Sequence, residues 1–458
     1  MTTPQTRSMR KRSLAPAILL LAAIVSTAVS ARTATSEASA LPISALEIAP
    51  LVQQGELSDK PGASGEGFGE AIAVSGRTLV VGTTHHMAAS TDVEQGAAYV
   101  FTTRAPGWAH AKQVAILKAP RGQSEETFGR SVAVAGRMIV VGAPGREIGG
   151  HTGQGAAWVF VKPASGWSHA APPLKLTAAR GQADEFFGES VAISGNTVLV
   201  GAPGRKVGRN AAQGAVDAFT LPRSRAASST QTAQLTAPDG KANDTLGISI
   251  AASGQTVLAG ADLHRVGTVE QGAAYIFMKP ASGWRHAREA AKLTAGQGQA
   301  RELFGRILTI WHDTAVIGAP NRSGVAAEQG AAYVFVKPTS GWTGSLTPTA
   351  QLTASDPGKD DEFGAALAIS GGVIAAGAPG HAIDKSTEQG AGYVFVKPTT
   401  GWKTATETDE LFAKNGTEGD KLGLSIAISG TAILLGAPDH QVNKERAQGA
   451  VYTFAAAP

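Results

Sequence analysis

Short runs of apolar residues, separated by tight turns and polar loops, recur along most of this chain. Residues 128–160 show the pattern once. Phe128-Gly129 precedes an apolar run, Gly136-Arg137 interrupts it, and a second run ends in Gly-Ala-Pro at 142–144. A polar loop then leads to Gln154-Gly155 and a third apolar run. Short apolar runs joined by a Gly-X pair are typical of β-hairpins, so the pattern predicts strands throughout.

Three steps of this pattern return with a period of 58–60 residues. The aromatic-Gly or Leu-Gly step begins at Phe68, Phe128, Phe187, Leu246, Phe304, Phe363 and Leu422. The Gly-Ala step begins at Gly142, Gly201, Gly260, Gly318, Gly377 and Gly436, with Gly82-Thr83 as a degenerate first copy. The Gln-Gly step begins at Gln95, Gln154, Gln213, Gln271, Gln329, Gln389 and Gln448. A fixed period of this length indicates a repeat fold, here of seven units.

Each unit predicts four strands, which in the second unit are expected at residues 131–135, 138–142, 156–162 and 173–177. Polar and apolar residues alternate only weakly in the first two runs, so these strands are expected to be buried on both faces. Four-stranded units of this length that pack around an axis are propeller blades. We therefore expect an all-β, seven-bladed β-propeller of antiparallel blades over residues 51–458, with repeats starting near 66, 126, 185, 244, 302, 361 and 420.

The last unit ends after its third run, Val451 to Phe454, and has no fourth. In the other units a Leu of the fourth strand stands 11 residues before the next aromatic-Gly step, and the same count back from Phe68 falls on Leu57. We expect the run Leu51 to Leu57 to complete the last blade, which closes the ring and removes exposed strand edges. The alternative is an open β-solenoid, which does not need this complementary truncation.

The order of aromatic-Gly, apolar run and Gly-Ala-Pro resembles the FG-GAP repeat, known from the N-terminal propeller of integrin α chains and from exported bacterial proteins. The resemblance covers residues 51–458. It implies a propeller, but this fold serves adhesion modules, lectins and accessory domains of enzymes, so it does not name an activity.

Integrin-type repeats often carry an acidic calcium loop between the aromatic-Gly and Gly-Ala-Pro steps. Here that interval holds only a two-residue turn such as Gly136-Arg137 or Gly195-Asn196. Calcium needs six to eight oxygen ligands, and a turn without an acid does not supply them. We expect no integrin-type calcium site, no other metal site and no cofactor.

Composition narrows the possible partners. The formal net charge is +4, with 17% charged residues, and part of the positive charge lies in an N-terminal segment expected to be removed. A nearly neutral chain gives no basis for a nucleic-acid partner. The chain has no cysteine, which excludes disulfides, thiolate metal sites and a Cys nucleophile.

Residues 1–31 resemble a secretory signal peptide. Arg10-Lys11-Arg12 form the charged start, Leu14 to Val29 the apolar centre, and Val29-Ser30-Ala31 a small-residue cleavage site. The apolar run contains Pro16 and is shorter than the roughly 20 residues needed to span a bilayer, so cleavage is favoured over a retained anchor. We expect residues 32–50 to be a flexible lead-in. The mature chain is expected to be a monomer without a membrane span, secreted, periplasmic or associated with the cell surface.

Two charged rows follow the repeat. An acid stands two residues before each aromatic-Gly step, at Glu66, Glu126, Glu185, Asp244, Glu302, Asp361 and Asp420. A basic or imidazole group stands four residues after the Gly of each Gly-Ala step, at His86, Arg146, Arg205, His264, Arg322, His381 and His440. In an antiparallel blade both rows emerge at the same end of the propeller. They could form a charged ring that captures an anionic ligand, or each acid could pair with its base and hold the loop to the blade connection.

Tryptophan recurs in Gly-Trp steps between strands three and four, at Trp108, Trp167, Trp284, Trp342 and Trp402. These rings could stack on sugars, as in propeller lectins with one site per blade, or they could be buried as packing residues at the hairpin. The third blade lacks the Trp, so a ring of sugar sites would be incomplete. The aromatic residues within strand three, such as Tyr99 and Trp158, are expected in the core.

Two features break the repeat. Trp311-His312-Asp313 replaces the Ser-Gly turn of the fifth blade, and His85-His86 doubles an imidazole in the first. With the nearby Asp92 and Glu94, the two histidines could hold a transition metal. Adjacent residues on an extended segment point apart, however, so His85 and His86 are not expected to share one. No catalytic spacing of Ser, His and Asp occurs, so no catalytic residue and no enzyme activity are expected.

The loops between strands two and three vary in sequence while the strands hardly do. They are residues 83–94, 143–153, 202–212, 261–270, 319–328, 378–388 and 437–447. Variable loops on a rigid scaffold are typical of recognition modules. We expect an exported, non-catalytic binding or adhesion-type module for an unknown protein or glycan; the alternative is a lectin that uses the Trp-bearing end.

Overall fold

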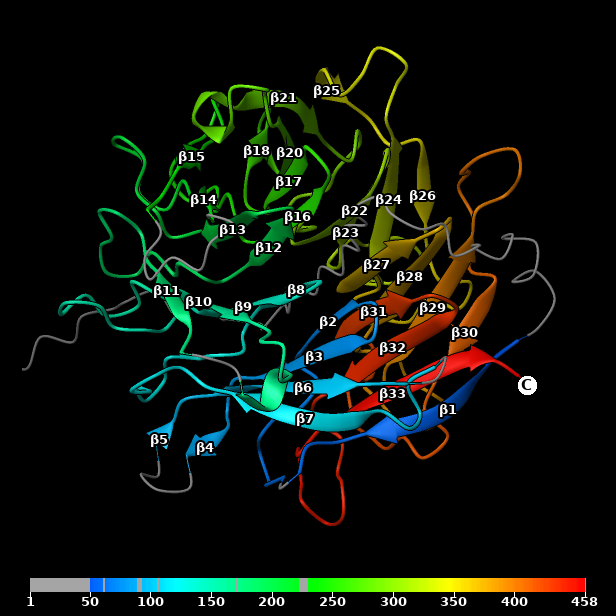
Figure 1. The fold of residues 1–458 in the computed structure, drawn as a ribbon. Helices are drawn as coiled ribbons and strands as arrows, with labels where there is room; N and C mark the ends of the chain where they lie inside the picture. The colour runs from blue at the N-terminus through cyan, green and yellow to red at the C-terminus, as the bar shows by residue number, and fades with distance from the viewer. Residues whose placement is uncertain are drawn as a thin grey trace, which may run out of the picture.

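The computed structural model describes residues 50–457, apart from residues 61, 89–92, 105–106, 170–171 and 222–229. The expected signal peptide and nearly all of the lead-in lie outside the described residues. Within them the chain is built of β-strands and two short 3-10 turns, η2 (Trp167–His169) and η3 (Trp284–His286). The strands form seven blades around a central axis (Figure 1), as the repeat predicts. No helix in the described part of the chain is long and apolar enough to cross a membrane.

Each blade is a sheet in which consecutive strands run antiparallel, from the inner strand to the rim. Blades 1 and 2 consist of β2 (Ala71–Ser75), β3 (Thr78–Thr83), β6 (Ala97–Thr102) and β7 (Lys112–Leu117), and of β8 (Val132–Ala135), β9 (Met138–Ala143), β10 (Ala156–Val161) and β11 (Leu174–Leu176). Blades 3 and 4 consist of β12 (Val191–Ser194), β13 (Thr197–Ala202), β14 (Ala215–Thr220) and β15 (Ala233–Leu235), and of β16 (Ile250–Ser253), β17 (Thr256–Ala261), β20 (Ala273–Met278) and β21 (Arg288–Leu293). Blades 5 and 6 consist of β22 (Ile307–Trp311), β23 (Thr314–Ala319), β24 (Ala331–Val336) and β26 (Ala350–Leu352), and of β27 (Ala366–Ser370), β28 (Val373–Ala378), β29 (Ala391–Val396) and β30 (Asp409–Leu411).

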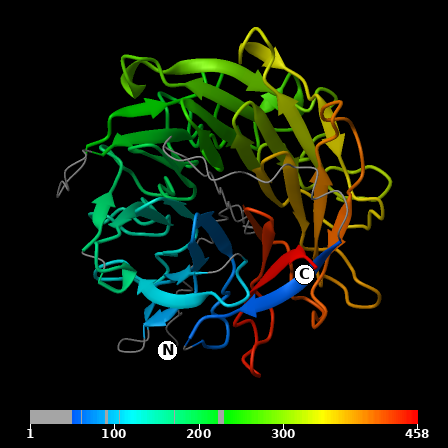
Figure 2. The ribbon, with the colours of Figure 1, turned by 45° about the vertical axis from the view of Figure 1, so that its right-hand side comes forward.

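The seventh blade combines the two ends of the described chain. Its inner strands are β31 (Ser425–Ser429), β32 (Ala432–Ala437) and β33 (Ala450–Ala456), and its outer strand is β1 (Leu51–Leu57). β1 runs antiparallel to β33, from Leu51 opposite Ala456 to Leu57 opposite Val451, with one irregularity near Gly55. In Figure 2 the blue first strand lies beside the red last strand. The backbone N–H of Leu51 also donates to Oδ2 of Asp409 in blade 6, at 2.7 Å.

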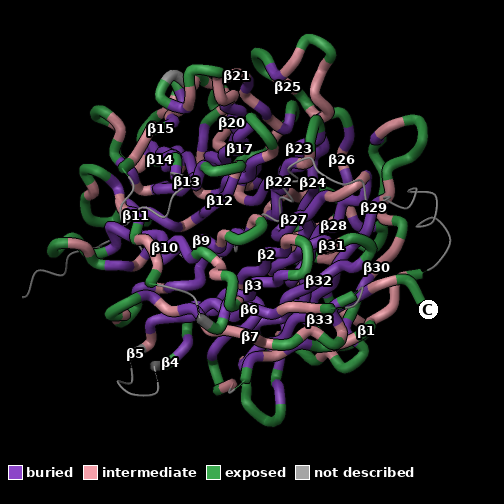
Figure 3. The backbone as a smooth tube through the Cα atoms, viewed as in Figure 1, coloured by how far each residue is buried: buried purple, intermediate pink, exposed green. Residues whose placement is uncertain are grey.

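The core consists of seven layers, one between each pair of neighbouring blades. The layer between blades 7 and 1 contains Leu57 and Val451 on one side and Phe68 and Tyr99 on the other. Burial is strongest in the inner strands and falls toward the loops at both ends (Figure 3). β13, for example, is buried over its whole length, as its weak alternation predicts. The apolar runs therefore serve contact between blades rather than one face of a sheet.

The repeated glycine steps join neighbouring blades. The aromatic-Gly step of each blade pairs with the Gln-Gly step of the preceding one, as in the bridge between Gly155 and Phe187. Gly155 has φ +84°, a conformation that favours glycine. A Cβ on Gly142 would lie 2.0 Å from the carbonyl oxygen of Gly188 in the next blade. The glycines that define the repeat are thus required by backbone contacts between blades.

Three further pairings add to the blades. β4 (Met87–Ala88) with β5 (Val93–Glu94), and β18 (Arg265–Val266) with β19 (Val269–Glu270), form small hairpins in the strand two–three loops of blades 1 and 4. β25 (Gly344–Leu346) leaves blade 5 and runs parallel to β21 of blade 4. The sequence pattern did not predict these short strands, which lie in the variable segments between the regular runs.

Candidate functional site

The strand two–three loops and the blade connections emerge together at one end of the propeller, which we call the loop face. It comprises the loops at 83–94, 143–153, 202–212, 261–270, 319–328, 378–388 and 437–447, with the segments that precede each aromatic-Gly step. Among the described residues, the loops of blades 1, 2, 3, 4, 6 and 7 contain small hairpins or single bridges. Besides β4–β5 and β18–β19, single bridges join Ile148 to His151, Val207 to Asn210, Ile383 to Ser386 and Val442 to Glu445.

Each blade ties its loop to its connection with one acid–base pair, which we call a latch pair. The pairs are His86–Glu66 (2.9 Å), Arg146–Glu126, Arg205–Glu185 (2.9 Å), His264–Asp244 (2.7 Å), Arg322–Glu302 (2.6 Å), His381–Asp361 (3.0 Å) and His440–Asp420 (2.7 Å). The two predicted charge rows therefore meet residue by residue. All seven acids are buried, and six of the seven bases are buried as well, Arg322 being partly exposed.

This geometry favours the structural alternative over the charged ring. Each base already contacts a carboxylate of its own blade, and an anionic ligand would have to displace that carboxylate from a buried position. The burial also changes the energy expected of a pair. An exposed pair contributes about 0–1 kcal/mol, whereas removing one partner of a buried pair leaves a charge without compensation and costs about 3–5 kcal/mol.

Aromatic side chains of strand three pack against the bases of the latch pairs. The rings of His264, His381 and His440 stand edge-on to Tyr275, Tyr393 and Tyr452, and the guanidinium of Arg146 lies over Trp158. These aromatic residues are buried, as expected from their place in strand three. In blade 3 an acid takes the aromatic position, and Arg205 contacts both Glu185 and Asp217.

The imidazoles of two latch pairs have pKa values that are shifted in opposite directions. Burial opposes protonation of His440, but its hydrogen bond with Asp420 and the charges of Asp420 and Glu56 outweigh burial and raise its pKa. Burial lowers the pKa of His86 to about 4, and the charge of Lys118 adds to this effect. At neutral pH, His86 is therefore neutral.

We expect substitutions at these two histidines to have opposite pH dependence. The stabilisation from His440 is complete below the unfolded-state pKa of about 6.5 and is lost as pH rises through the higher folded-state pKa. The cost of His440→Gln should thus shrink between pH 6 and pH 9. For His86 the stabilisation is present above about 6.5 and is lost as pH falls toward 4, so the cost of His86→Gln should shrink on acidification. Urea unfolding at several pH values measures both; the same trend for both variants would contradict this assignment.

The Trp row lies at the opposite end and is buried, with 1–6% of each residue exposed. Each ring packs against the fourth strand of the preceding blade. Trp284 lies in one cluster with Leu235 and donates from Nε1 to Oγ1 of Thr197 at 3.2 Å, while Trp342 shares a cluster with Leu293. Rings covered in this way favour the packing alternative, because sugar stacking requires an open ring face.

The two features that break the repeat also have structural partners. His85 contacts Glu94 and lies near Glu70, whereas His86 contacts Glu66, so the two imidazoles face different acids. Asp92 lies outside the described residues. At the turn of blade 5, the N–H of His312 donates to Oγ of Ser253 in blade 4 at 3.0 Å.

Single apolar side chains are exposed on the loop face, in the loops of blades 1 and 5 and in the connection before blade 3. Val325, in the loop of blade 5, is 91% exposed, and Met87 and Phe186 are 45% and 37% exposed. A hollow of 240 Å³ lies between the β18–β19 hairpin and the connection that follows blade 4. It is lined by Arg265, Thr268, Val269, Glu270, Ala300 and Arg301.

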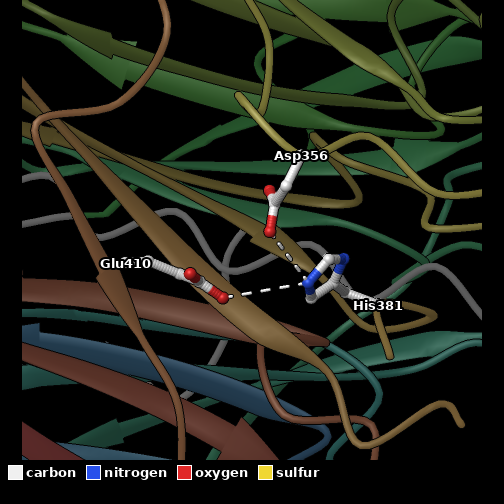
Figure 4. Close-up of side chains that lie close together, drawn as sticks. All are labelled: Asp356, His381 and Glu410. Atoms are coloured by element: carbon white, nitrogen blue, oxygen red, sulfur yellow. Dashed lines mark ion pairs between the residues drawn. The ribbon is translucent and has the colours of Figure 1, made fainter. Parts of the chain in front are cut away.

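Blade 6 brings His381, a member of the predicted basic row, together with Asp356 and Glu410, which were not singled out from the sequence (Figure 4). Nε2 of His381 faces Oδ2 of Asp356 at 3.4 Å and Oε1 of Glu410 at 3.8 Å. They come from the connection before blade 6, from its strand two–three loop and from β30. A comparison of the repeats could have indicated this group. Glu410 stands opposite Tyr393 in blade 6, at the position that Lys292 holds opposite Tyr275 in blade 4.

The family comparison agrees with this architecture. A family model of the FG-GAP repeat matches residues 51–101, 111–160, 173–219, 229–277, 287–335, 346–395 and 405–454. The chain belongs to the FG-GAP repeat family. Each matched segment begins with the outer strand of one blade and continues through three strands of the next, so the FG-GAP unit is offset by one strand from the blade.

Two solved structures resemble this FG-GAP chain. The first is the periplasmic gluconolactonase PpgL of Pseudomonas aeruginosa, at 15% identity and TM-score 0.48, with 75% of this chain and 84% of that chain covered. The second is a complex of KlAtg21 with the coiled-coil of AgAtg16, at 11% identity and TM-score 0.44, with the same coverage. Among curated proteins, none matches the chain.

Proposed function

We propose that this FG-GAP propeller is an exported, non-catalytic binding module that recognises a protein or a glycan through the loop face. The observation that carries the proposal is that one face presents seven loops that vary in sequence and include exposed side chains, above all Val325 at 91%. Loops that a rigid scaffold presents at one face commonly carry the residues of recognition sites. The latch pairs support it further, because they hold each loop to the scaffold and so lower the entropy lost on binding.

The proposal includes export and a monomeric mature chain. The charged start, apolar centre and small residues before Ala31 support cleavage at that point. The ring is complete within one chain, since β1 supplies the outer strand of blade 7, so assembly does not depend on a partner strand.

We expect Val325→Glu to weaken capture of the ligand at least tenfold, because a charge at the centre of an apolar contact must be desolvated on binding. The matched control is Val161→Glu, since Val161 is 44% exposed at the end of β10, away from the loop face. Both variants and the parent protein would be applied to a glycan array and to a cell-surface extract. Equal capture by all three proteins would contradict recognition through the loop face.

A further inference from the structure

We propose that Asp356, His381 and Glu410 form a binding site for a divalent transition-metal ion of the zinc type, beside the outer strand of blade 6. The site differs in place and ligand type from the acidic calcium loops of integrin-type repeats, because it lies between the strand two–three loop and β30 and includes a nitrogen ligand. It also departs from the absence of metal sites expected from the sequence.

The histidine nitrogen already lies close to metal-site distances from both carboxylates. Nε2 of His381 lies 3.4 Å from Oδ2 of Asp356 and 3.8 Å from Oε1 of Glu410, and one ligand atom from each residue lies within 4.8 Å of the others. Ligands bound tetrahedrally to Zn²⁺ at its usual bond lengths lie about 3.3–3.5 Å apart. The two distances to the histidine thus lie within about 0.5 Å of this separation, and rotation of the exposed Asp356 and partly exposed Glu410 side chains can adjust the distance between the two carboxylates.

Neighbouring groups orient two of the ligands. Nδ1 of His381 lies 3.0 Å from Oδ2 of the buried Asp361, so a neutral imidazole donates from Nδ1 and directs the lone pair of Nε2 toward the two carboxylates. The hydroxyl of Tyr393 donates to Oδ1 of Asp356 at 3.2 Å and leaves Oδ2 for the ion. A carboxylate behind a metal-binding histidine is a common arrangement that fixes the tautomer and the ring orientation.

Blade 4 provides an internal comparison in which a cation occupies the equivalent position. There His264 lies 3.5 Å from Asp239, and Nζ of Lys292 lies 2.7 Å from both Nε2 of His264 and Oδ2 of Asp239. Lys292 stands opposite Tyr275 in the sheet, and Glu410 stands opposite Tyr393. Blade 6 thus keeps the histidine, the aspartate and the tyrosine, but has the carboxylate of Glu410 where blade 4 has the ammonium of Lys292.

The exposure of the group suits an exchangeable ion. The side chain of His381 is 8% exposed, while those of Asp356 and Glu410 are 48% and 31% exposed, so the ion can approach from solvent. Three protein ligands leave a fourth tetrahedral position for water. One nitrogen and two carboxylate oxygens suit zinc, whereas Ca²⁺ prefers six to eight oxygens.

The test uses tag-free protein that has been stripped with EDTA, dialysed against ZnCl₂ and analysed for bound zinc. We expect one ion per wild-type chain and none in Glu410→Lys, which places an ammonium where blade 4 has one and so keeps the fold. Asp356→Asn, at an exposed position, should weaken zinc binding at least tenfold and gives a second readout if the first variant does not fold. Lys292→Glu should create a second site in blade 4 and raise the stoichiometry to two.

Loss of zinc in the first two variants with an unchanged circular dichroism spectrum supports the site, as does the gain in Lys292→Glu. Absence of bound zinc in the wild-type chain overturns the proposal. So does retention of the same ion in both Glu410→Lys and Asp356→Asn, because zinc held elsewhere, for example at His85, would be unaffected by these changes.

Discussion

A chain that begins at residue 58, and so lacks β1, is expected to lose its soluble monomeric fold. β33 would then present its N–H and C=O groups as an open edge, and the layer between blades 7 and 1 would lose Leu57, which is 5% exposed. An exposed strand edge pairs readily with other chains, so we expect aggregates or swapped oligomers. Size-exclusion chromatography and thermal unfolding measure the effect.

Two control proteins separate the role of β1 from that of the residues before it. A chain that begins at residue 50 keeps β1 and should behave as the full mature chain. A circular permutant that begins at residue 58 and joins residue 458 to residue 50 through a short Gly-containing turn should also be monomeric, because Leu51 lies opposite Ala456. A stable monomer without β1 in any form would show that this strand is dispensable.

Arg146→Met is expected to destabilise the propeller by about 3–5 kcal/mol. The substitution keeps the apolar stem over Trp158 but leaves the carboxylate of Glu126, which is 0% exposed, without its cation. Burial raises the pKa of Glu126 even in the presence of Arg146. Without the arginine the carboxyl should take up a proton more readily, so the deficit should shrink as pH falls. Urea unfolding at pH 5 and pH 8 measures both the cost and its pH dependence.

The matched control is Arg265→Met. Arg265 contacts Glu270 at 2.9 Å, but the two side chains are 55% and 30% exposed, so their separation should cost at most about 1 kcal/mol. The double variant Glu126→Gln/Arg146→Met should recover most of the stability, because no unpaired charge remains. Equal costs for Arg146→Met and Arg265→Met would contradict a structural role for the latch pair.

The repeat alone predicts the fold because each motif residue serves a contact that must be made seven times. The strands expected at 138–142 and 156–162 are observed at Met138–Ala143 and Ala156–Val161. The placement of both charge rows at one end of the propeller also follows from antiparallel topology, whereas their pairing was one of two alternatives. Their burial does not follow from this topology, because it depends on how the aromatic residue of strand three and the neighbouring blade cover each pair.

The group at Asp356, His381 and Glu410 was missed for a related reason. Its members lie 25 and 29 residues apart and belong to a connection, a loop and an outer strand. Only the sheet register, which sets Glu410 opposite Tyr393, brings the third member to the other two. Strand β25 was also missed, since its pairing with β21 of another blade is a tertiary contact without a periodic signal.

The latch pairs affect which loop residues of this propeller can be replaced without loss of the fold. Each pair lies within one blade, with its partners 20 residues apart, as in Glu185–Arg205 and Asp420–His440. The backbone bridges that join neighbouring blades use the glycine steps instead. The start of each loop is therefore anchored within its own blade, whereas its end also meets the connection to the next blade: the carbonyl oxygens of Ala211 and Ala212 accept from the N–H groups of Asn243 and Thr245. The hairpin tip at residues 208–209, between the bridged Val207 and Asn210, is therefore the part that we expect to accept a foreign peptide while the latch pair and the next blade stay intact.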